Sequence, residues 1–435
     1  MDIVRRHCRF LRESQWWSAA DLRDYQWRHI KRVYAHVLRH VPLYQDLYEG
    51  RSSHLNNWDE FLDLPVLTKD RLMESDGGCH SQRLPPGHHA LPVIHTSGST
   101  GQKMEVHPTS VTEQFRAALS IREFEWHGVR PEGSAMVIRA LITPDEPNYE
   151  ALMEGVRAPS WASGYVAGLV NTGPGYFMDV GADVQRQVKF LDAVRPEYLM
   201  SNASNLVEMA ELWTEDRRSR SRLKLIRTLA ETLYDDYRKR IEEAFGVPVY
   251  DAYSSAELNS IASECAGCEG LHVQDENVLL EVLREDGTPC EPGEVGRAVL
   301  TGLHHYGTPF IRYELGDMVE SAEPCSCGRG LALLRHVHGR TFTMIQRPNG
   351  SPVLSSALFH VLNELRGLRG VQVRQHGPER FEALVVCSGA DAADLSKKIV
   401  QAFRGVLWPE VEVEVRVVEA LQRSAGGKLE RFVRL

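Results

Sequence analysis

The chain has 435 residues, more than one hydrophobic core usually supports, so we expect two or more domains. Hydrophobic residues make up 43% and charged residues 25%, which is ordinary for a globular protein, and no apolar run approaches the roughly 18 residues of a membrane span. The net charge of −9 lacks the basic excess that nucleic-acid binding requires. We therefore expect a small-molecule partner, no nucleic acid and no membrane, and we keep a homodimer as one option for the oligomeric state.

The N-terminal stretch MDIVRRHCRFLRESQWW has no apolar core or small-residue cleavage site of the kind that a secretory signal carries. This favours a cytoplasmic location. Eight cysteines are too few for a disulfide scaffold in a chain this long, so we expect them to be reduced thiols or metal ligands.

Apolar residues at helical spacing predict helices within residues 18–48, 184–194, 204–213 and 235–245. Apolar runs at 223–229 and 247–252 flank the last of these helices, and this β-α-β order implies a parallel sheet. Short runs at 278–283, 296–301 and 310–313 are separated by Gly, Pro and Asp, which predicts an antiparallel, barrel-like unit.

After residue 340 the pattern restarts. It predicts helices at 355–365 and 394–407 and strands at 370–375, 381–387 and 411–418. We therefore expect an α/β fold in which a large N-terminal domain, residues 1–339, has mixed parallel sheets flanked by helices plus a small β-barrel-like subdomain. A small, mobile α+β C-terminal domain, residues 340–435, would follow it.

The stretch HTSGSTGQKMEVHP, residues 95–108, follows the apolar run 91–94. A run of Gly, Ser and Thr after a strand leaves backbone N–H groups and hydroxyls free, and such donors suit phosphate oxygens. An ordinary polar surface loop is the alternative interpretation. A Walker-type loop is disfavoured, because Lys103 is followed by Met104 where that motif requires Ser or Thr.

Further unusual stretches follow in a fixed order: AETLYDDYRKRIEEAFG, DAYSSAELN, PFIRYELGD, HGR and RSAGGKLER. Over nearly the full chain, this series resembles the adenylate-forming enzymes, specifically the branch of phenylacetate–CoA ligases and capsule-biosynthesis ligases. The resemblance implies that a carboxylic acid, for which we expect an aromatic one, attacks the α-phosphate of ATP to give an acyl-adenylate and pyrophosphate. The acyl group would then pass to coenzyme A; an amine, a carrier-protein thiol and a non-catalytic scaffold are kept as alternatives.

The resemblance also implies roles for individual residues. The ATP phosphates would contact Thr96, Ser97, Gly98, Ser99, Thr100, Gly101 and Lys103. Adenine would contact Ala230–Glu231, unless these residues only begin a helix with an acidic first turn. The nucleotide would also meet Tyr253, Ser254 and Ser255.

The remaining implied roles are those of the charged residues. Glu257 would be the catalytic acid that binds Mg²⁺, and Asp317 would bind the ribose hydroxyls. Arg340 would follow the last strand of the large domain, at the hinge, and touch the ribose, and Lys428 would be the catalytic lysine. The chain departs from the family pattern at Ser254, Ala256, Glu314, Leu315 and Thr343.

A Cys265-x-x-Cys268 pair, His272 and a Cys325-x-Cys327 pair offer five ligands for a tetrahedral, structural zinc ion. Some members of the same ligase branch have a similar pattern. On that resemblance we favour Cys265, His272, Cys325 and Cys327, with Cys268 as the competing ligand and unligated thiols as the alternative.

Overall fold

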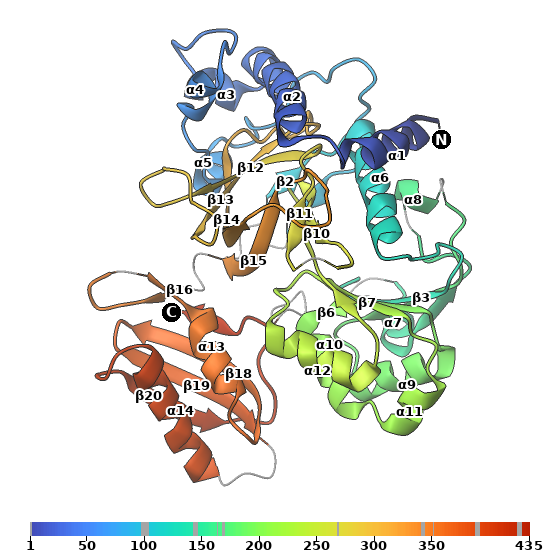
Figure 1. The fold of residues 1–435 in the computed structure, drawn as a ribbon, viewed down its shortest axis with the longest axis vertical. Helices are drawn as coiled ribbons and strands as arrows, with labels where there is room; N and C mark the ends of the chain where they lie inside the picture. The colour runs from blue at the N-terminus through green and yellow to red at the C-terminus, as the bar shows by residue number, and fades with distance from the viewer. Residues whose placement is uncertain are drawn as a thin grey trace.

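The computed structural model describes residues 2–96, 104–141, 147–162, 164–167, 170–267, 269–340, 344–350, 352–387, 392–423 and 429–435. Within these ranges the chain forms two large sheets, a smaller C-terminal sheet and two short hairpins (Figure 1). None of the described helices is both long and apolar enough to cross a lipid bilayer.

The first large sheet is mostly parallel, with strand order β4-β5-β3-β6-β7-β8, and only β4 runs antiparallel to its neighbour. Parallel neighbours need crossover connections, which helices provide here. The strands are β3 (Ala135–Arg139), β4 (Val156–Ala158), β5 (Gly175–Asp179), β6 (Tyr198–Asn202), β7 (Leu225–Leu229) and β8 (Val249–Tyr250). The helices are α7 (Tyr149–Glu154), α8 (Gly164–Ala167), α9 (Val184–Val194), α10 (Ala203–Leu212), α11 (Glu215–Arg220) and α12 (Asp235–Phe245).

The second large sheet has strand order β12-β13-β14-β15-β11-β10-β9, and all its pairs are antiparallel. Its strands are β9 (Ala252–Ser255), β10 (Asn259–Glu264), β11 (Leu271–Val273), β12 (Val278–Leu283), β13 (Val295–Gly302), β14 (Tyr313–Ala322) and β15 (Leu333–Arg340). Among the described strands β12 does not pair with β9, so this sheet is open. Residues 310–312 are not the expected strand, since Arg312 has φ +48° and β14 begins only at Tyr313.

Helices α1 to α6 and the hairpin β1–β2 precede these sheets (Figure 1). They are α1 (Asp2–Ser14), α2 (Ala19–His40), α3 (Pro42–Leu47), α4 (Trp58–Leu62), α5 (Lys69–Glu74), β1 (Ile94–His95), β2 (Glu105–Val106) and α6 (Ser110–Trp126). A serine N-cap opens α2: the Ser18 side chain accepts a hydrogen bond from Asp21 N, as the common capping pattern requires.

The segment after β15, which we call the C-terminal lobe, has sheets of its own (orange and red in Figure 1). A hairpin pairs β16 (Met344–Gln346) with β17 (Pro352–Leu354), and a four-stranded sheet has the order β20-β19-β18-β21. Its elements are α13 (Ser355–Asn363), β18 (Leu368–Gly377), β19 (Arg380–Cys387), α14 (Ala392–Val406), β20 (Glu412–Val417) and β21 (Phe432–Arg434).

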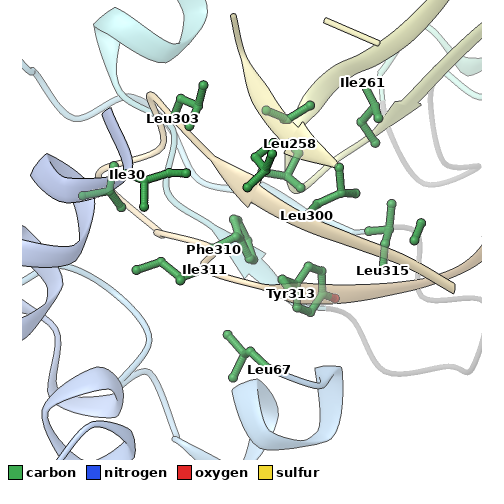
Figure 2. Packing of buried hydrophobic residues seen from close by; sticks show 14 of the residues in the cluster. Ile30, Leu67, Leu258, Ile261, Leu300, Leu303, Phe310, Ile311, Tyr313 and Leu315 are labelled. Atoms are coloured by element: carbon green, nitrogen blue, oxygen red, sulfur yellow. The ribbon is translucent and has the colours of Figure 1, made fainter. Parts of the chain in front are cut away.

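One hydrophobic core includes residues next to the two candidate acids in the sequence (Figure 2). Leu258, just before β10, Ile261 of β10 and Leu315 of β14 are buried in it, with Leu258 and Ile261 completely shielded. Leu258 follows Glu257 in the sequence and Leu315 precedes Asp317 by two positions. The packing therefore fixes the backbone that carries both candidate acids, and truncating such a leucine to alanine typically costs about 2–5 kcal/mol.

Candidate functional site

The stretch DAYSSAELN folds into the hairpin β9–β10, and its turn contains Glu257. Asn259 adopts φ +59°, a left-handed conformation that asparagine tolerates better than most residues. The Ser255 hydroxyl accepts a hydrogen bond from Leu258 N at 3.0 Å and so braces the turn. Glu257 is held at the tip of the turn with only 6% of its surface exposed.

Tyr253 and Asp317 meet although 64 residues separate them in the sequence. The Tyr253 hydroxyl donates a hydrogen bond to Asp317 Oδ2 at 2.7 Å, and both side chains are buried. In the strand register Asp317 of β14 lies opposite Arg340 of β15. The backbone therefore brings together three residues for which the sequence predicted nucleotide contacts.

The predicted phosphate loop is carried by the hairpin β1–β2. Thr96 N donates to Met104 O at 2.9 Å, and Met104 N donates to Thr96 Oγ1 at 3.0 Å, so these two residues close the stem. Ser97, Gly98, Ser99, Thr100, Gly101 and Lys103 lie outside the described residues.

The stem of this hairpin lies beside Glu257. A cavity of about 10 Å³, roughly the room that one water needs, is lined by Glu257 together with Ile94, Val106 and His107. His305 also lines this cavity, and neither of its ring nitrogens has a hydrogen-bond partner among the described residues. The candidate acid and residues of hairpin β1–β2 therefore line the same cavity.

Ala230 and Glu231 follow β7 at the carboxyl end of the parallel sheet, where ligands of open α/β sheets usually bind. Ala230 has φ +59°, a strained conformation for a residue with a Cβ. The Glu231 carboxylate accepts hydrogen bonds from Ser204 N at 2.9 Å and Ser204 Oγ at 3.0 Å. Glu231 thus lies against the first turn of α10 and does not begin a helix, since α12 starts only at Asp235.

The C-terminal lobe reaches this same place. Leu429 N donates a hydrogen bond to Glu231 Oε1 at 2.8 Å. Lys428 itself lies outside the described residues, but its neighbour in the sequence is therefore bonded to the predicted adenine element. Arg423, from the same terminal segment, donates to Ser204 Oγ at 2.7 Å and forms an ion pair with Glu208 at 2.6 Å.

Arg431 forms a further contact across the two lobes that the sequence did not predict. Its guanidinium carbon lies 4.8 Å from the ring centre of Tyr234, 4.9 Å from that of Tyr237 and 4.2 Å from that of Phe359. The side chain is 3% exposed and its Nη2 donates to Asn363 at 2.7 Å. A buried cation among aromatic faces is a stabilising arrangement, and it lies three positions after Lys428.

A larger groove of about 710 Å³ lies beside α12, β8 and β10, within the size range of ligand pockets. Leu233, Asp251 and Val337 line it. Each of the three is two or three positions in the sequence from a predicted site residue. Those site residues, Glu231, Tyr253 and Arg340, do not line the groove themselves.

Cys265, His272, Cys325 and Cys327 converge, as the sequence predicted, and we call them the cysteine–histidine cluster. Their ligand atoms all lie within 4.8 Å of one another, and Cys327 Sγ is 3.3 Å from His272 Nε2. Burial lowers the pKa of His272 to about 4, helped by Arg329, so the imidazole is neutral and able to bind a metal. Burial raises the pKa of the Cys265 thiol to about 11 in the absence of a metal, with the neighbouring Cys327 adding to the effect.

The cluster departs from expectation in one respect. Cys325 is disulfide-bonded rather than free, whereas the sequence predicted thiols or metal ligands. Cys268 lies outside the described residues. Because zinc binds thiolates, Cys325 could serve as a ligand only in the reduced protein.

Trp161 donates to Gly133 O at 2.8 Å, and its ring centre lies 5.3 Å from that of Phe124 in a buried core. Ser254 is exposed on β9.

Comparisons with known proteins agree with this arrangement. No protein-family model matches the chain. Phenylacetate-coenzyme A ligase of Escherichia coli (strain K12) is 23% identical over 338 residues, which cover 75% of this chain and 73% of the ligase. Protein CapK of Staphylococcus aureus is 26% identical over 207 residues, 46% of this chain and 44% of CapK.

Among solved structures, 2-hydroxyisobutyryl-CoA ligase in its postadenylation state superposes with a TM-score of 0.76 at 21% identity, covering 97% of this chain and 93% of that one. The same ligase in its thioesterification state gives a TM-score of 0.62 at 21% identity, covering 96% and 91%. The chain therefore has the fold of the adenylate-forming CoA ligases, and it is similar in sequence to phenylacetate-coenzyme A ligase and to CapK.

Proposed function

We propose that the protein is an AMP-forming acid–thiol ligase that converts a carboxylic acid, which we expect to be aromatic, into an acyl-adenylate and then transfers the acyl group to coenzyme A. The single observation that carries this proposal is the 2.8 Å hydrogen bond from Leu429 N to Glu231. It joins the segment beside Lys428 to the element that would hold adenine. ATP and coenzyme A would be the cosubstrates, and we place the reaction in the cytoplasm.

In this reaction some residues would hold the substrates in line and others would neutralise their negative charge. Asp317, buried beside Tyr253, would accept hydrogen bonds from the ribose hydroxyls, and the two stem residues of hairpin β1–β2 would hold the phosphate loop. Lys428 would approach the α-phosphate and the acid's carboxylate, where a flexible cation can offset the negative charge that builds up during attack.

Glu257 fits a magnesium site, because a buried carboxylate facing a cavity of water size offers the hard oxygen ligand that Mg²⁺ prefers. When bound, the ion would neutralise phosphate charge. The cysteine–histidine cluster fits a structural zinc ion in reduced protein, since it supplies sulfur and imidazole donors within one small volume.

We further propose that residues 1–339 and 340–435 are separate domains and that the second one rotates between the two half-reactions. Two facts support this division. The described chain has separate sheets before and after residues 341–343, and the contacts between the lobes include polar ones from Arg423 to Ser204, from Leu429 to Glu231 and from Arg431 to Asp236 that can be released. The larger TM-score with the postadenylation state than with the thioesterification state suggests that the lobes are docked for the first half-reaction.

The test is pyrophosphate release with MgATP and a panel of aryl and aliphatic acids. We expect acid-dependent release that Lys428→Ala reduces severely, because the loss of one preorganised charge contact in a transition state costs about 10²–10³-fold. Lys397→Ala, which changes a lysine on α14 of the same lobe, is the matched control and should keep the wild-type rate. Unchanged release by Lys428→Ala would contradict the proposal.

Transfer of the acyl group to an amine or a carrier-protein thiol is the second candidate. Product formation from one activated acid should be compared with coenzyme A, amines and carrier protein as acceptors. If only coenzyme A gives product, the acid–thiol ligase assignment stands.

A further inference from the structure

We propose that His80, Glu105 and His107 form a second metal site, specific for a divalent transition-metal ion such as Zn²⁺ or Co²⁺, at the stem of hairpin β1–β2. One ligand atom from each of the three side chains lies within 4.8 Å of the other two. Two imidazoles and one carboxylate are a donor set that suits transition metals better than Mg²⁺ or Ca²⁺. This site contains no cysteine and does not depend on the proposed ligase activity.

The two histidine rings are stacked face to face. Their centres are 3.8 Å apart and their planes differ by 3°, so one ring must turn out of the stack for a nitrogen of each to bind the same ion. Glu105 Oε2 lies 3.7 Å from His107 Nε2, which is too long for a hydrogen bond. His107 Nε2 is shielded from solvent and has no hydrogen-bond partner among the described residues, so a ring nitrogen and a carboxylate face each other with no bond between them.

Thr308 provides the outer support that metal-binding histidines usually have. Its Oγ1 lies 3.0 Å from His80 Nδ1 and accepts a hydrogen bond from His107 N at 2.8 Å. If Nδ1 of His80 donates its proton to that hydroxyl, the lone pair of His80 Nε2 is available to a metal.

The distances require only a small adjustment. Zinc–nitrogen and zinc–oxygen bonds are about 2.0–2.2 Å, so two ligands of one ion lie roughly 3–4 Å apart. The group as it stands is slightly wider than this, and Glu105 can close the difference because 56% of its side chain is exposed. Three protein ligands would leave one position of a tetrahedral ion open, so we expect an exchangeable metal.

Metal binding at this place would anchor the phosphate loop. Glu105 belongs to β2, and Met104 before it closes the loop's stem. His80 lies on the segment after α5. The next residue, Ser81, donates hydrogen bonds from its backbone N to Gly307 O and from its hydroxyl to Tyr306 O. An ion shared by these residues would tie β2 to that segment, so occupancy should slow amide hydrogen exchange in β2.

The test uses the full-length protein, dialysed against a mild chelator and titrated with Co²⁺ under calorimetry and visible absorption. We expect uptake of one Co²⁺ that shows d–d bands without a thiolate charge-transfer band and that persists in Cys327→Ser. His80→Gln, Glu105→Gln and His107→Gln should each weaken it by at least about tenfold. Glu105→Gln changes an exposed side chain, so it should fold even if a histidine variant does not.

His88→Gln is the matched control, because His88 Nδ1 also lies 3.0 Å from a threonine hydroxyl, that of Thr109, but does not belong to the group of three. It should bind Co²⁺ as the wild type does. The proposal is overturned if all the Co²⁺ that the wild type binds shows the thiolate charge-transfer band, which would place it on cysteine. It is also overturned if Glu105→Gln binds Co²⁺ as tightly as His88→Gln.

Discussion

Arg423→Ala should impair adenylation selectively, because Arg423 connects the C-terminal lobe to α10. Its two terminal nitrogens contact Ser204 Oγ at 2.7 Å and Glu208 Oε1 at 2.6 Å. The Arg423 side chain is 22% exposed and that of Glu208 is 49% exposed, so water screens the ion pair only in part.

The expected magnitude follows from these two contacts. A partly exposed ion pair contributes about 0.2–1 kcal/mol, and a hydrogen bond from a charged group to a hydroxyl contributes about 1.5 kcal/mol at the low end of its range. Losing both should weaken lobe docking by about 1.5–2.5 kcal/mol, which is roughly a 10- to 60-fold change in an equilibrium constant.

The assay separates the two half-reactions. Acid-dependent pyrophosphate release should fall by roughly tenfold or more in Arg423→Ala, whereas thioester formation from supplied acyl-adenylate and coenzyme A should not fall. Arg416→Ala is the matched control, because Arg416 pairs with Glu382 and Glu414 within its own lobe. Equal losses in both half-reactions, or none in pyrophosphate release, would refute the reasoning; a double-mutant cycle with Glu208→Ala should show coupling of about 0.5 kcal/mol or more.

Three further outcomes concern stability. Glu276→Gln should lower the free energy of unfolding by about 3–5 kcal/mol in urea denaturation, because it leaves buried Arg122 without its counter-charge; the two side chains are 0% and 2% exposed and 2.7 Å apart. A decrease in the free energy of unfolding of less than about 1 kcal/mol would contradict this, because it would show that water solvates the Arg122 charge in the variant. Burial, with Arg32 and Arg28, lowers the pKa of His29 to about 4 in the folded protein. Between pH about 6.5 and 4 the unfolded chain therefore binds a proton that the folded chain does not, and the free energy of unfolding of the wild type falls. His29→Gln lacks this group, so its free energy of unfolding does not fall for this reason. The stability deficit of His29→Gln should therefore narrow as the pH falls, and a deficit that widens would contradict this. Chelation of the reduced protein should lower the melting temperature without changing the chemistry of adenylation, and metal analysis showing well under one zinc per chain would remove the zinc assignment.

Sequence patterns correctly predicted the helices that bury apolar residues on one face only. The helix predicted over 184–194 and the one over 235–245 match α9 and α12 residue for residue, since each has one buried face. The helix α6 was missed because both of its sides are covered: Arg122 and Glu123 are buried along with its apolar residues, which hides the period. The parallel strands β3, β5 and β6 were missed too, because they are short, largely buried runs without alternation.

The candidate site, too, was predicted only in part from the sequence. Motif order pointed to Tyr253, Glu257, Asp317 and Glu231. The contacts between lobes could not be predicted, because 198 residues separate Glu231 from Leu429 and no local pattern encodes that distance. Arg431 looked like one more charge beside a terminal lysine, and only its aromatic surroundings distinguish it.

The departure at Glu314 bears on which acceptor the enzyme uses. In the family pattern an arginine is common there, and its replacement by an acid gave a reason to consider an acceptor other than coenzyme A. In the structure Glu314 accepts a hydrogen bond from Arg297 Nη1 at 2.8 Å across β13 and β14, so its charge is balanced within the sheet. Ser255, next to Ala256, uses its hydroxyl to brace the turn that carries Glu257. Glu314 thus has a local structural partner, and the neighbour of Ala256 supports the turn, so neither departure requires a different acceptor. The case for an amine or a carrier protein must therefore come from the acceptor assay and not from these substitutions.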